Sequence, residues 1–365
     1  MSEIITEVNN ARKDIKSDFY NMSVGEISNL YKEKEIILNP AYQRLYRWND
    51  EQKTNFVESL ILGFPIPPIF VAQQQDGTWD LVDGVQRIST VLQMMGILQG
   101  YSPLKLTSCK YIPSMEECTW DILPMEVKRL IKRARLSVNI ILTENSITAQ
   151  YEVFQRLNTG GLHLSDQEIR NCLIIMSDET FYDAVNEFKA TESFVSLTPI
   201  TKDKFKEEYR MELIIRYLVA KARKTDFENY KLHKTHVRDF LDAESLKLIN
   251  DSDYSVNEEL TLLNNILTRL YEIVGEELFR KYSAEKGRFE GKFSLQVFEA
   301  ILPGIASNFD LIKTKSKEEI FEIIKDICTQ GKYIEATKRG QKALIRYKLL
   351  TELSYEYFDA LGLPT

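Results

Sequence analysis

The sequence has no run of about eighteen apolar residues, the length that a helix needs to cross a membrane. Its first residues, MSEIITEVNNARKD, lack the basic and apolar stretches of a secretory signal. The four cysteines do not show the paired spacing of a metal site (Cys109, Cys118, Cys172 and Cys328). These absences predict a cytoplasmic protein with free thiols and no membrane contact.

Histidine is scarce as well, because the chain contains only His163, His233 and His236. This scarcity argues against a histidine-rich metal site. Neither a Walker A pattern nor an H-x-E…C-x-x-C pattern is present, which argues against the enzymes that these motifs mark. The formal net charge of −7 excludes a uniformly basic coat for nucleic acid but leaves room for local basic patches.

What remains is an ordinary globular composition, with 44% hydrophobic and 28% charged residues in a chain of 365, long enough for two domains. Strand-like and helix-like periods alternate in the first half. The elements expected there are a helix over 22–33 capped by Ser23, a strand over 35–40, a helix over 48–64, a hairpin over 69–83 turning at Asp76-Gly77, helices over 85–96 and 125–135, a strand over 136–142 and a helix over 148–161.

From about residue 165 onward the pattern is almost wholly helical. The first of these helices begins with Ser165 and Glu168, which have the spacing of a capping box. No internal repeat or low-complexity linker separates the two halves. We therefore predict an α+β fold, with a mixed domain over 1–175 followed by an all-α domain over 176–365.

The stretch DGVQR, residues 83–87, places polar and flexible residues where a strand meets a helix. Asp83 is expected to cap the helix, while Gly84 lets the backbone turn and a ligand approach. The helix start attracts phosphate, which Arg87 could grip with a bidentate fork. Asp83 could hold magnesium or an activated water, and Gln86 could orient a water or a base edge. The plainer interpretation is a capped helix with a surface arginine.

The stretch NPAYQRLYRW, residues 39–48, interleaves aromatic residues with arginines. In an extended conformation it places Tyr42, Arg44 and Tyr46 on one side, which suits stacking on bases and pairing with phosphates. The alternative is a strand that packs its aromatic rings in the core while its arginines reach solvent.

Residues 154–165, FQRLNTGGLHLS, contain a loop between two helices, made of Asn158, Thr159, Gly160 and Gly161. Two glycines beside a helix start can form an anion-binding concavity. The alternative is an ordinary helix C-cap followed by a turn.

Together these stretches resemble a known family. Residues 39–48, 63–69 (GFPIPPI), 83–87 and 154–171 are similar, in order and spacing, to the family called "domain of unknown function 262". Its members include the N-terminal half of GmrSD-type restriction enzymes that attack modified phage DNA. The family looks like a branch of the ParB/sulfiredoxin-like nucleotide-binding and nuclease superfamily, and the resemblance covers roughly residues 20–175.

The resemblance implies a ParB-like N-terminal domain with a pocket that binds or hydrolyses a nucleoside triphosphate. Magnesium is the further cofactor expected if Asp83 holds an ion. The positions that match the family's D-G-x-Q-R are Asp83, Gly84, Gln86 and Arg87. The other matching positions are Arg44, on the facing strand, and Asn158, Thr159 and Gly160, in the N-T-G loop.

The sequence departs from the family in two places. Val85 stands where the family usually has glutamine, so activity is altered if this position touches the ligand and unaffected if it faces the core. Many relatives also carry or pair with an HNH-type nuclease half, whereas His233 and His236 lack a D-H or H-x-x-N companion. We expect these histidines on a polar helix or loop face, so that cleavage would need a partner subunit.

Two basic clusters stand against the net acidity of the chain. The first consists of Lys128, Arg129, Lys132, Arg133 and Arg135, and the second of Lys332, Lys338, Arg339, Lys342, Arg346 and Lys348. In the second cluster Gly340 indicates a turn that could meet a phosphate backbone, so we predict DNA contacts there (Lys338, Arg339, Lys342 and Arg346). The alternatives are a solvated face with acidic neighbours and a partner-docking surface.

The hypothesis from the sequence is a component of a restriction or anti-phage system. Its N-terminal domain would bind and hydrolyse a nucleoside triphosphate, coupled to recognition of modified DNA by the helical domain, with a nuclease partner subunit and self-association as further expectations. One alternative is a non-catalytic, nucleotide-gated module that binds DNA or acts as a scaffold. Another is a metal-dependent nuclease whose N-terminal pocket acts directly on DNA.

Overall fold

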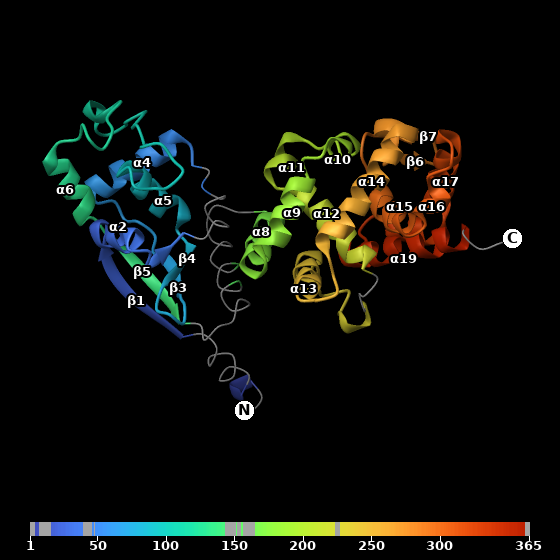
Figure 1. The fold of residues 1–365 in the computed structure, drawn as a ribbon, viewed down its shortest axis with the longest axis horizontal. Helices are drawn as coiled ribbons and strands as arrows, with labels where there is room; N and C mark the ends of the chain where they lie inside the picture. The colour runs from blue at the N-terminus through green and yellow to red at the C-terminus, as the bar shows by residue number, and fades with distance from the viewer. Residues whose placement is uncertain are drawn as a thin grey trace. The chain divides into compact units, whose positions relative to one another are not determined.

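The computed structural model describes residues 4–6, 16–38, 46, 48–142, 151, 155, 165–222 and 227–361. The chain divides into two compact units, Met1–His163 and Leu164–Thr365, which we call unit 1 and unit 2. Unit 1 contains a mixed sheet with helices, and unit 2 is built mainly of helices (Figure 1). This arrangement confirms the predicted α+β fold class.

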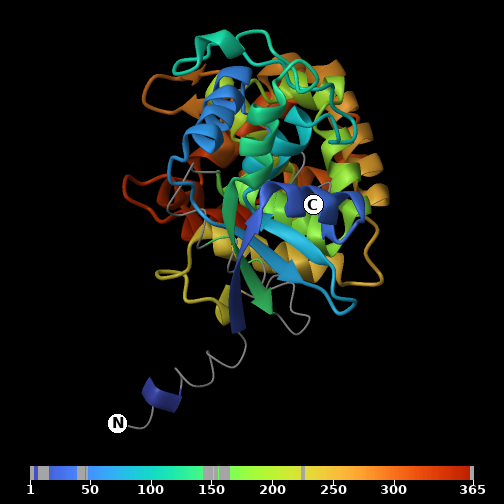
Figure 2. The same cartoon turned by 90° about the vertical axis from the view of Figure 1, so that its left-hand side faces the viewer.

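Unit 1 is built on a five-stranded sheet with the strand order β1-β5-β3-β4-β2, which Figure 2 brings toward the viewer. β1 (Lys16–Ser23) runs antiparallel to β5 (Arg135–Leu142), and β5 runs parallel to β3 (Ile69–Gln73). β3 is antiparallel to β4 (Trp79–Asp83), which is parallel to β2 (Ile36–Ile37). The sheet is therefore mixed, with β1 and β2 at its edges.

The predicted hairpin joins β3 and β4. Gly77 in its turn has a φ of 88°, a conformation that glycine adopts without steric cost. The Gln74 N–H donates to the Thr78 carbonyl at 2.8 Å and closes the turn. β4 then ends at Asp83, and α5 (Val85–Met94) begins after a single intervening residue. The hairpin thus places the DGVQR stretch at the C-terminal end of β4, a strand with a neighbour on each side.

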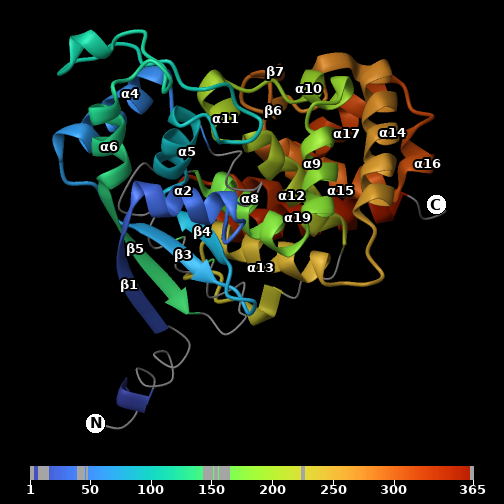
Figure 3. The same cartoon turned by 60° about the vertical axis from the view of Figure 1, so that its left-hand side comes forward.

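Helices pack on one side of this sheet, as Figures 1 and 3 both show. They are α2 (Val24–Lys32), α4 (Asp50–Leu62), α5 and α6 (Met125–Arg133). Ser23, the predicted cap of α2, and Asn49, the N-cap of α4, each form a capping box with the residue three positions later. The four cysteines of the chain are free.

Unit 2 is helical apart from one small hairpin, formed by β6 (Lys281–Ser283) and β7 (Arg288–Glu290). Its helices are α8 (Asp166–Ser177), α9 (Glu179–Phe188), α10 (Glu192–Leu197), α11 (Lys202–Lys206), α12 (Tyr209–Lys221), α13 (Val237–Ile249), α14 (Val256–Val274), α15 (Leu295–Ser307), α16 (Phe309–Ile312), α17 (Lys317–Thr329), α18 (Gly331–Ala336) and α19 (Ala343–Leu361). The predicted capping box of Ser165 and Glu168 starts α8. Among the described helices of both units, none is long and apolar enough to cross a membrane.

Two ion pairs lie almost completely inside unit 2. Arg170 Nε lies 2.7 Å from Asp242 Oδ1 and joins α8 to α13. Arg216 Nη1 lies 2.8 Å from Glu299 Oε1 and joins α12 to α15. Burial by itself lowers the pKa of Arg216, but the carboxylates of Glu299 and Glu212 outweigh this effect and raise it overall. Arg216 therefore stays charged inside the core.

Candidate functional site

The junction between β4 and α5 holds the DGVQR stretch. Gly84, and not Asp83 as predicted, is the N-cap of α5, and it has a φ of 102°. A β-carbon at Gly84 would lie 2.5 Å from Cγ2 of Ile69 on β3, which is closer than such atoms can approach. The expectation that this glycine leaves room for a ligand is thus wrong on the side of the missing β-carbon, because Ile69 occupies that space.

Arg87 extends from the first turn of α5 back toward the end of β4. Its Nη2 donates to Asp83 Oδ2 at 2.8 Å, and its Nη1 donates to the carbonyl oxygens of Pro67 and Pro68, the second at 3.0 Å. The side chain of Arg87 is 12% exposed and that of Asp83 is 33% exposed. Burial lowers the pKa of Arg87, and the Asp83 carboxylate opposes this shift. Arg87 is thus a paired, mostly buried cation and not the surface arginine of the plainer interpretation.

The start of α5 has no side-chain cap, since its N-cap residue Gly84 carries no side chain. The Ile88 N–H closes the first turn by donating to the Gly84 carbonyl at 2.9 Å. The N–H groups before Ile88 have no acceptor within the helix and carry the positive end of its dipole. The N–H groups at this end of α5 can therefore donate hydrogen bonds to an anionic oxygen, next to the partly exposed carboxylate of Asp83.

Gln86 and Val85 lie on the same first turn and have different surroundings. Gln86 Oε1 accepts a hydrogen bond from the backbone N–H of Trp48 at 3.1 Å. Val85 is only 7% exposed and packs in the core. The burial of Val85 favours the alternative in which its departure from the family has no effect on the ligand.

Within residues 39–48 the structure describes Tyr46 and Trp48. The Tyr46 hydroxyl donates to Gln93 Oε1 at 2.6 Å, and its ring meets the ring of Tyr101 edge-on at a centroid distance of 5.3 Å. Burial raises the pKa of Tyr46. These contacts favour the packing alternative for Tyr46, whose hydroxyl binds a side chain of α5.

The remaining residues of the predicted nucleotide site are Arg44, Asn158, Thr159 and Gly160, and they lie outside the described residues. The structure therefore brings together four predicted site residues at one junction (Asp83, Gly84, Gln86 and Arg87). The positions of the others relative to this junction stay predictions.

The part played by residues 67–69 was not anticipated from the sequence. Pro67 and Pro68 supply the carbonyl oxygens that hold the guanidinium of Arg87, and Ile69 packs against Gly84. A signal for the first contact was available, because consecutive prolines keep the chain extended and leave their carbonyls without helical partners. Nothing in the spacing of the residues indicated the second contact.

The described residues contain no group of three His, Cys, Asp or Glu side chains that could hold a metal ion. Asp83 alone fits magnesium only if phosphate oxygens and water complete the coordination, as is common for this ion. His233 and His236 line a hollow of about 540 Å³ together with Lys342. His236 is the N-cap of α13, so the two histidines lie on a polar loop and helix start, as expected.

The predicted DNA-contacting residues near the C-terminus differ in their surroundings. Lys338 and Arg339 are exposed in the segment before α19. Lys342 Nζ donates to the backbone carbonyl of His233, and Arg346 is half-buried. Gly340 has a φ of 87°, which agrees with the predicted turn. Lys338 and Arg339 thus face solvent, whereas Lys342 is hydrogen-bonded within unit 2 and Arg346 is partly covered.

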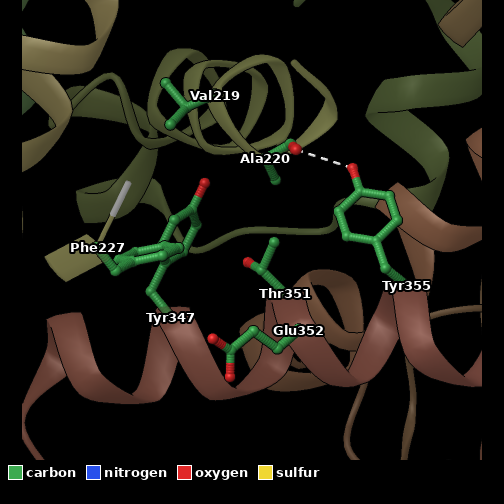
Figure 4. Close-up of a pocket in the computed structure, with 7 residues that line it drawn as sticks. All are labelled: Val219, Ala220, Phe227, Tyr347, Thr351, Glu352 and Tyr355. Atoms are coloured by element: carbon green, nitrogen blue, oxygen red, sulfur yellow. Dashed lines mark hydrogen bonds between the residues drawn. The ribbon is translucent and has the colours of Figure 1, made fainter. Parts of the chain in front are cut away.

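A hollow of about 250 Å³ in unit 2 contains none of the predicted site residues (Figure 4). It is lined by Val219, Ala220, Phe227, Tyr347, Thr351, Glu352 and Tyr355. The Tyr355 hydroxyl donates to the Ala220 carbonyl at 2.8 Å and bridges α19 to α12. Aromatic and aliphatic groups dominate this lining, so the hollow lacks the cluster of cations that a phosphate site would need.

Comparison with protein-family models gives a match over residues 27–175 to the GmrSD restriction endonuclease, N-terminal domain. The matched segment includes the β4–α5 junction and the residues that hold Arg87. Comparison with curated proteins and with solved structures gave no match. Residues 27–175 of the chain are therefore similar to the GmrSD restriction endonuclease N-terminal domains, which confirms the resemblance found in the sequence.

Proposed function

We propose that the chain is a component of a DNA restriction system in which unit 1 binds and hydrolyses a nucleoside triphosphate. The family match supports the restriction context. The observation that carries the nucleotide proposal is the junction at Gly84. There an uncapped helix start lies beside the ion pair of Asp83 and Arg87.

In this proposal a phosphate oxygen accepts hydrogen bonds from the first-turn N–H groups of α5. Arg87 has five N–H donors, and its described hydrogen bonds to Asp83, Pro67 and Pro68 use three of them. The Nε–H and one Nη2–H therefore remain for the phosphate. Arg44, with the N-T-G loop, would complete the cradle, because these residues match the family's motif.

Asp83 has a second role in the proposal. Its carboxylate is one-third exposed and has oxygen lone pairs beyond the one that Arg87 occupies. Together with phosphate oxygens it would hold magnesium or position the attacking water. Gln86 would keep the first turn of α5 in place through Trp48. Hydrolysis would be coupled to recognition of DNA, and cleavage would be supplied by a nuclease partner.

A second candidate is a nucleotide-gated module of the same fold that does not hydrolyse its ligand. One observation favours it: three of the five N–H donors of Arg87 already bind Asp83 and two carbonyl oxygens, which holds the side chain in place without a ligand. In this case the nucleotide would only shift the population of two states.

The test measures the thermal unfolding of the full chain with ATP, GTP, CTP and UTP, each with and without magnesium, together with phosphate release. We expect one nucleotide to stabilise the protein by about 2.7 kcal/mol at a concentration of 100 times Kd, because a ligand of the native state stabilises it by mass action. Hydrolysis that is lost in Arg87→Lys supports the first candidate, and stabilisation without hydrolysis supports the second. Absence of any nucleotide-dependent shift in the wild type would contradict both.

A further inference from the structure

The surface of α6 carries a set of cations that form no salt bridge among the residues that the structure describes. Four of them lie on the helix and one begins β5 (Lys128, Arg129, Lys132, Arg133 and Arg135). None forms an ion pair with a carboxylate in the described part of the chain. At 100° per residue the four helical cations span an arc of roughly 140°. They therefore form one continuous basic stripe, which we call the α6 surface.

The ring of Trp120 contacts two lysines of the α6 surface. Lys128 Nζ and Lys132 Nζ each lie 5.9 Å from the ring centroid of Trp120. A cation over an aromatic face is held by electrostatic attraction to the ring. The two lysines are thus kept side by side one helical turn apart, although like charges repel.

The helix itself is firmly attached to unit 1. The Val24 N–H donates to the Ala134 carbonyl at 2.9 Å, directly after the end of α6. A β-carbon on Gly25 would lie 3.4 Å from the Lys132 carbonyl oxygen, so α2 approaches α6 closely there. Ile131 anchors the inner face of α6 in the core. A binding surface on such a rigid element loses little conformational freedom when a partner binds.

The contribution of these cations to helix stability does not account for the whole set. Lys132 and Arg133 lie in the last turn of α6, where positive charge is favoured by the helix dipole. Lys128, Arg129 and Arg135 lie outside that turn. Glu26 interacts electrostatically with Arg135, and Glu126 lies in the first turn of α6, but five cations against these two carboxylates leave an excess of positive charge. Such an excess suits an anionic partner.

The basic cluster near the C-terminus is different in this respect. Lys332 pairs with Glu356 at 2.5 Å, and Lys348 approaches Glu352 at 3.7 Å. Ion pairs within the C-terminal cluster neutralise part of its charge, whereas the cations of the α6 surface form no salt bridge among the described residues.

We propose that the α6 surface binds the phosphate backbone of duplex DNA, an inference that rests on the proposed restriction function for the choice of DNA as the partner. Phosphates of the duplex would release their counterions to Lys128, Arg129 and the cations that follow them. The contacts would be independent of sequence, because lysine and arginine on the backbone position a protein without reading bases. DNA would then be bound in part by unit 1, and not by the helical unit alone.

The test uses the full chain and fluorescence anisotropy of a labelled duplex at several salt concentrations. For Arg129→Gln/Arg133→Gln we expect about tenfold weaker binding. We also expect a slope of log K against log salt that is smaller by about 2, because each lost phosphate contact contributes about 0.9. The matched control is Lys281→Gln/Lys292→Gln, which removes two exposed cations from unit 2 and should change the affinity less than twofold.

Two further measurements separate the outcomes. The nucleotide-dependent thermal shift should be unchanged in Arg129→Gln/Arg133→Gln. This result would show that unit 1 of the variant is folded and that nucleotide binding does not depend on the α6 surface. Exposed apolar residues flank the stripe (Ile122, Met125 and Leu130), so vesicles rich in phosphatidylserine serve as a competing anionic partner. The inference is overturned if the wild type binds no duplex, or if Arg129→Gln/Arg133→Gln binds the duplex as tightly as the wild type does. It is also overturned if Lys338→Gln/Arg339→Gln weakens duplex binding more than Arg129→Gln/Arg133→Gln does. A loss of vesicle binding without a loss of duplex binding in Arg129→Gln/Arg133→Gln would overturn it as well.

Discussion

The Asp83–Arg87 pair of unit 1 and the Arg170–Asp242 pair of unit 2 have the same chemistry and nearly the same length, 2.8 and 2.7 Å. They differ in burial, because Arg170 and Asp242 are 1% and 8% exposed while Asp83 is 33% exposed. An enclosed pair cannot change partners without leaving a buried charge alone. A pair with an accessible carboxylate can take up a ligand. The difference distinguishes a purely structural pair from a candidate site.

The largest expected effect comes from the enclosed pair. Arg170→Ala should lower the free energy of unfolding by about 3–5 kcal/mol, because Asp242 would remain buried without its cation. Urea unfolding measures this loss. In the control, Arg170→Met/Asp242→Leu, both charges are absent and much of the stability should return. If Arg170→Ala unfolds at the same urea concentration as the wild type, burial does not make the Arg170–Asp242 pair more important for stability than the Asp83–Arg87 pair.

Gly84 permits a second comparison within unit 1. Gly84→Ala should cost about 2–4 kcal/mol, because the new β-carbon meets Ile69 while the backbone keeps a positive φ. Gly63, at the end of α4, has a φ of 75° and open space around it, so Gly63→Ala should cost only about 1 kcal/mol. Equal losses in thermal or urea unfolding would show that close packing against β3 contributes nothing.

Much of the fold was predictable because its signals are local. The Asp76-Gly77 turn indicated the β3–β4 hairpin, and Ser23 and Ser165 marked helix starts that the structure confirms. The edge strands were the exception. β1 was not predicted. Its neighbouring aromatic residues Phe19 and Tyr20 are both exposed, so its sequence lacks the alternation of apolar and polar residues that marks a half-buried strand. β2 is two residues long, shorter than expected, and pairs with β4.

The candidate site was predictable in its residues but not in its contacts. The DGVQR stretch was found from its position between a strand and a helix, and the family match covers it. The partners of Arg87 come from Pro67 and Pro68, about twenty positions earlier, and pairing at that distance depends on the tertiary fold. The same holds for Arg170, whose sequence neighbours give no sign of Asp242 on another helix.

Arg87 connects stability to the proposed function. Arg87→Ala should lower the free energy of unfolding by about 2 kcal/mol, because two proline carbonyls and Asp83 lose a charged donor. It should also abolish the nucleotide-dependent thermal shift. Arg87→Lys keeps the charge but not the planar fork, so it should recover part of the stability and little of the nucleotide binding. A full nucleotide response in Arg87→Ala would make this residue purely structural.

The smallest expected effect on stability is at Asp83, and it is the most informative. Asp83→Asn should cost at most about 1 kcal/mol, because its partly exposed carboxylate is screened by water and Arg87 keeps both proline carbonyls. Asp242→Asn in the enclosed pair should cost several times more by the same urea measurement. The magnesium dependence of nucleotide binding should nevertheless disappear in Asp83→Asn and persist in Asp242→Asn. The reverse pattern would mean that the exposed carboxylate merely orients Arg87, and that the ion, where one is needed, is held elsewhere.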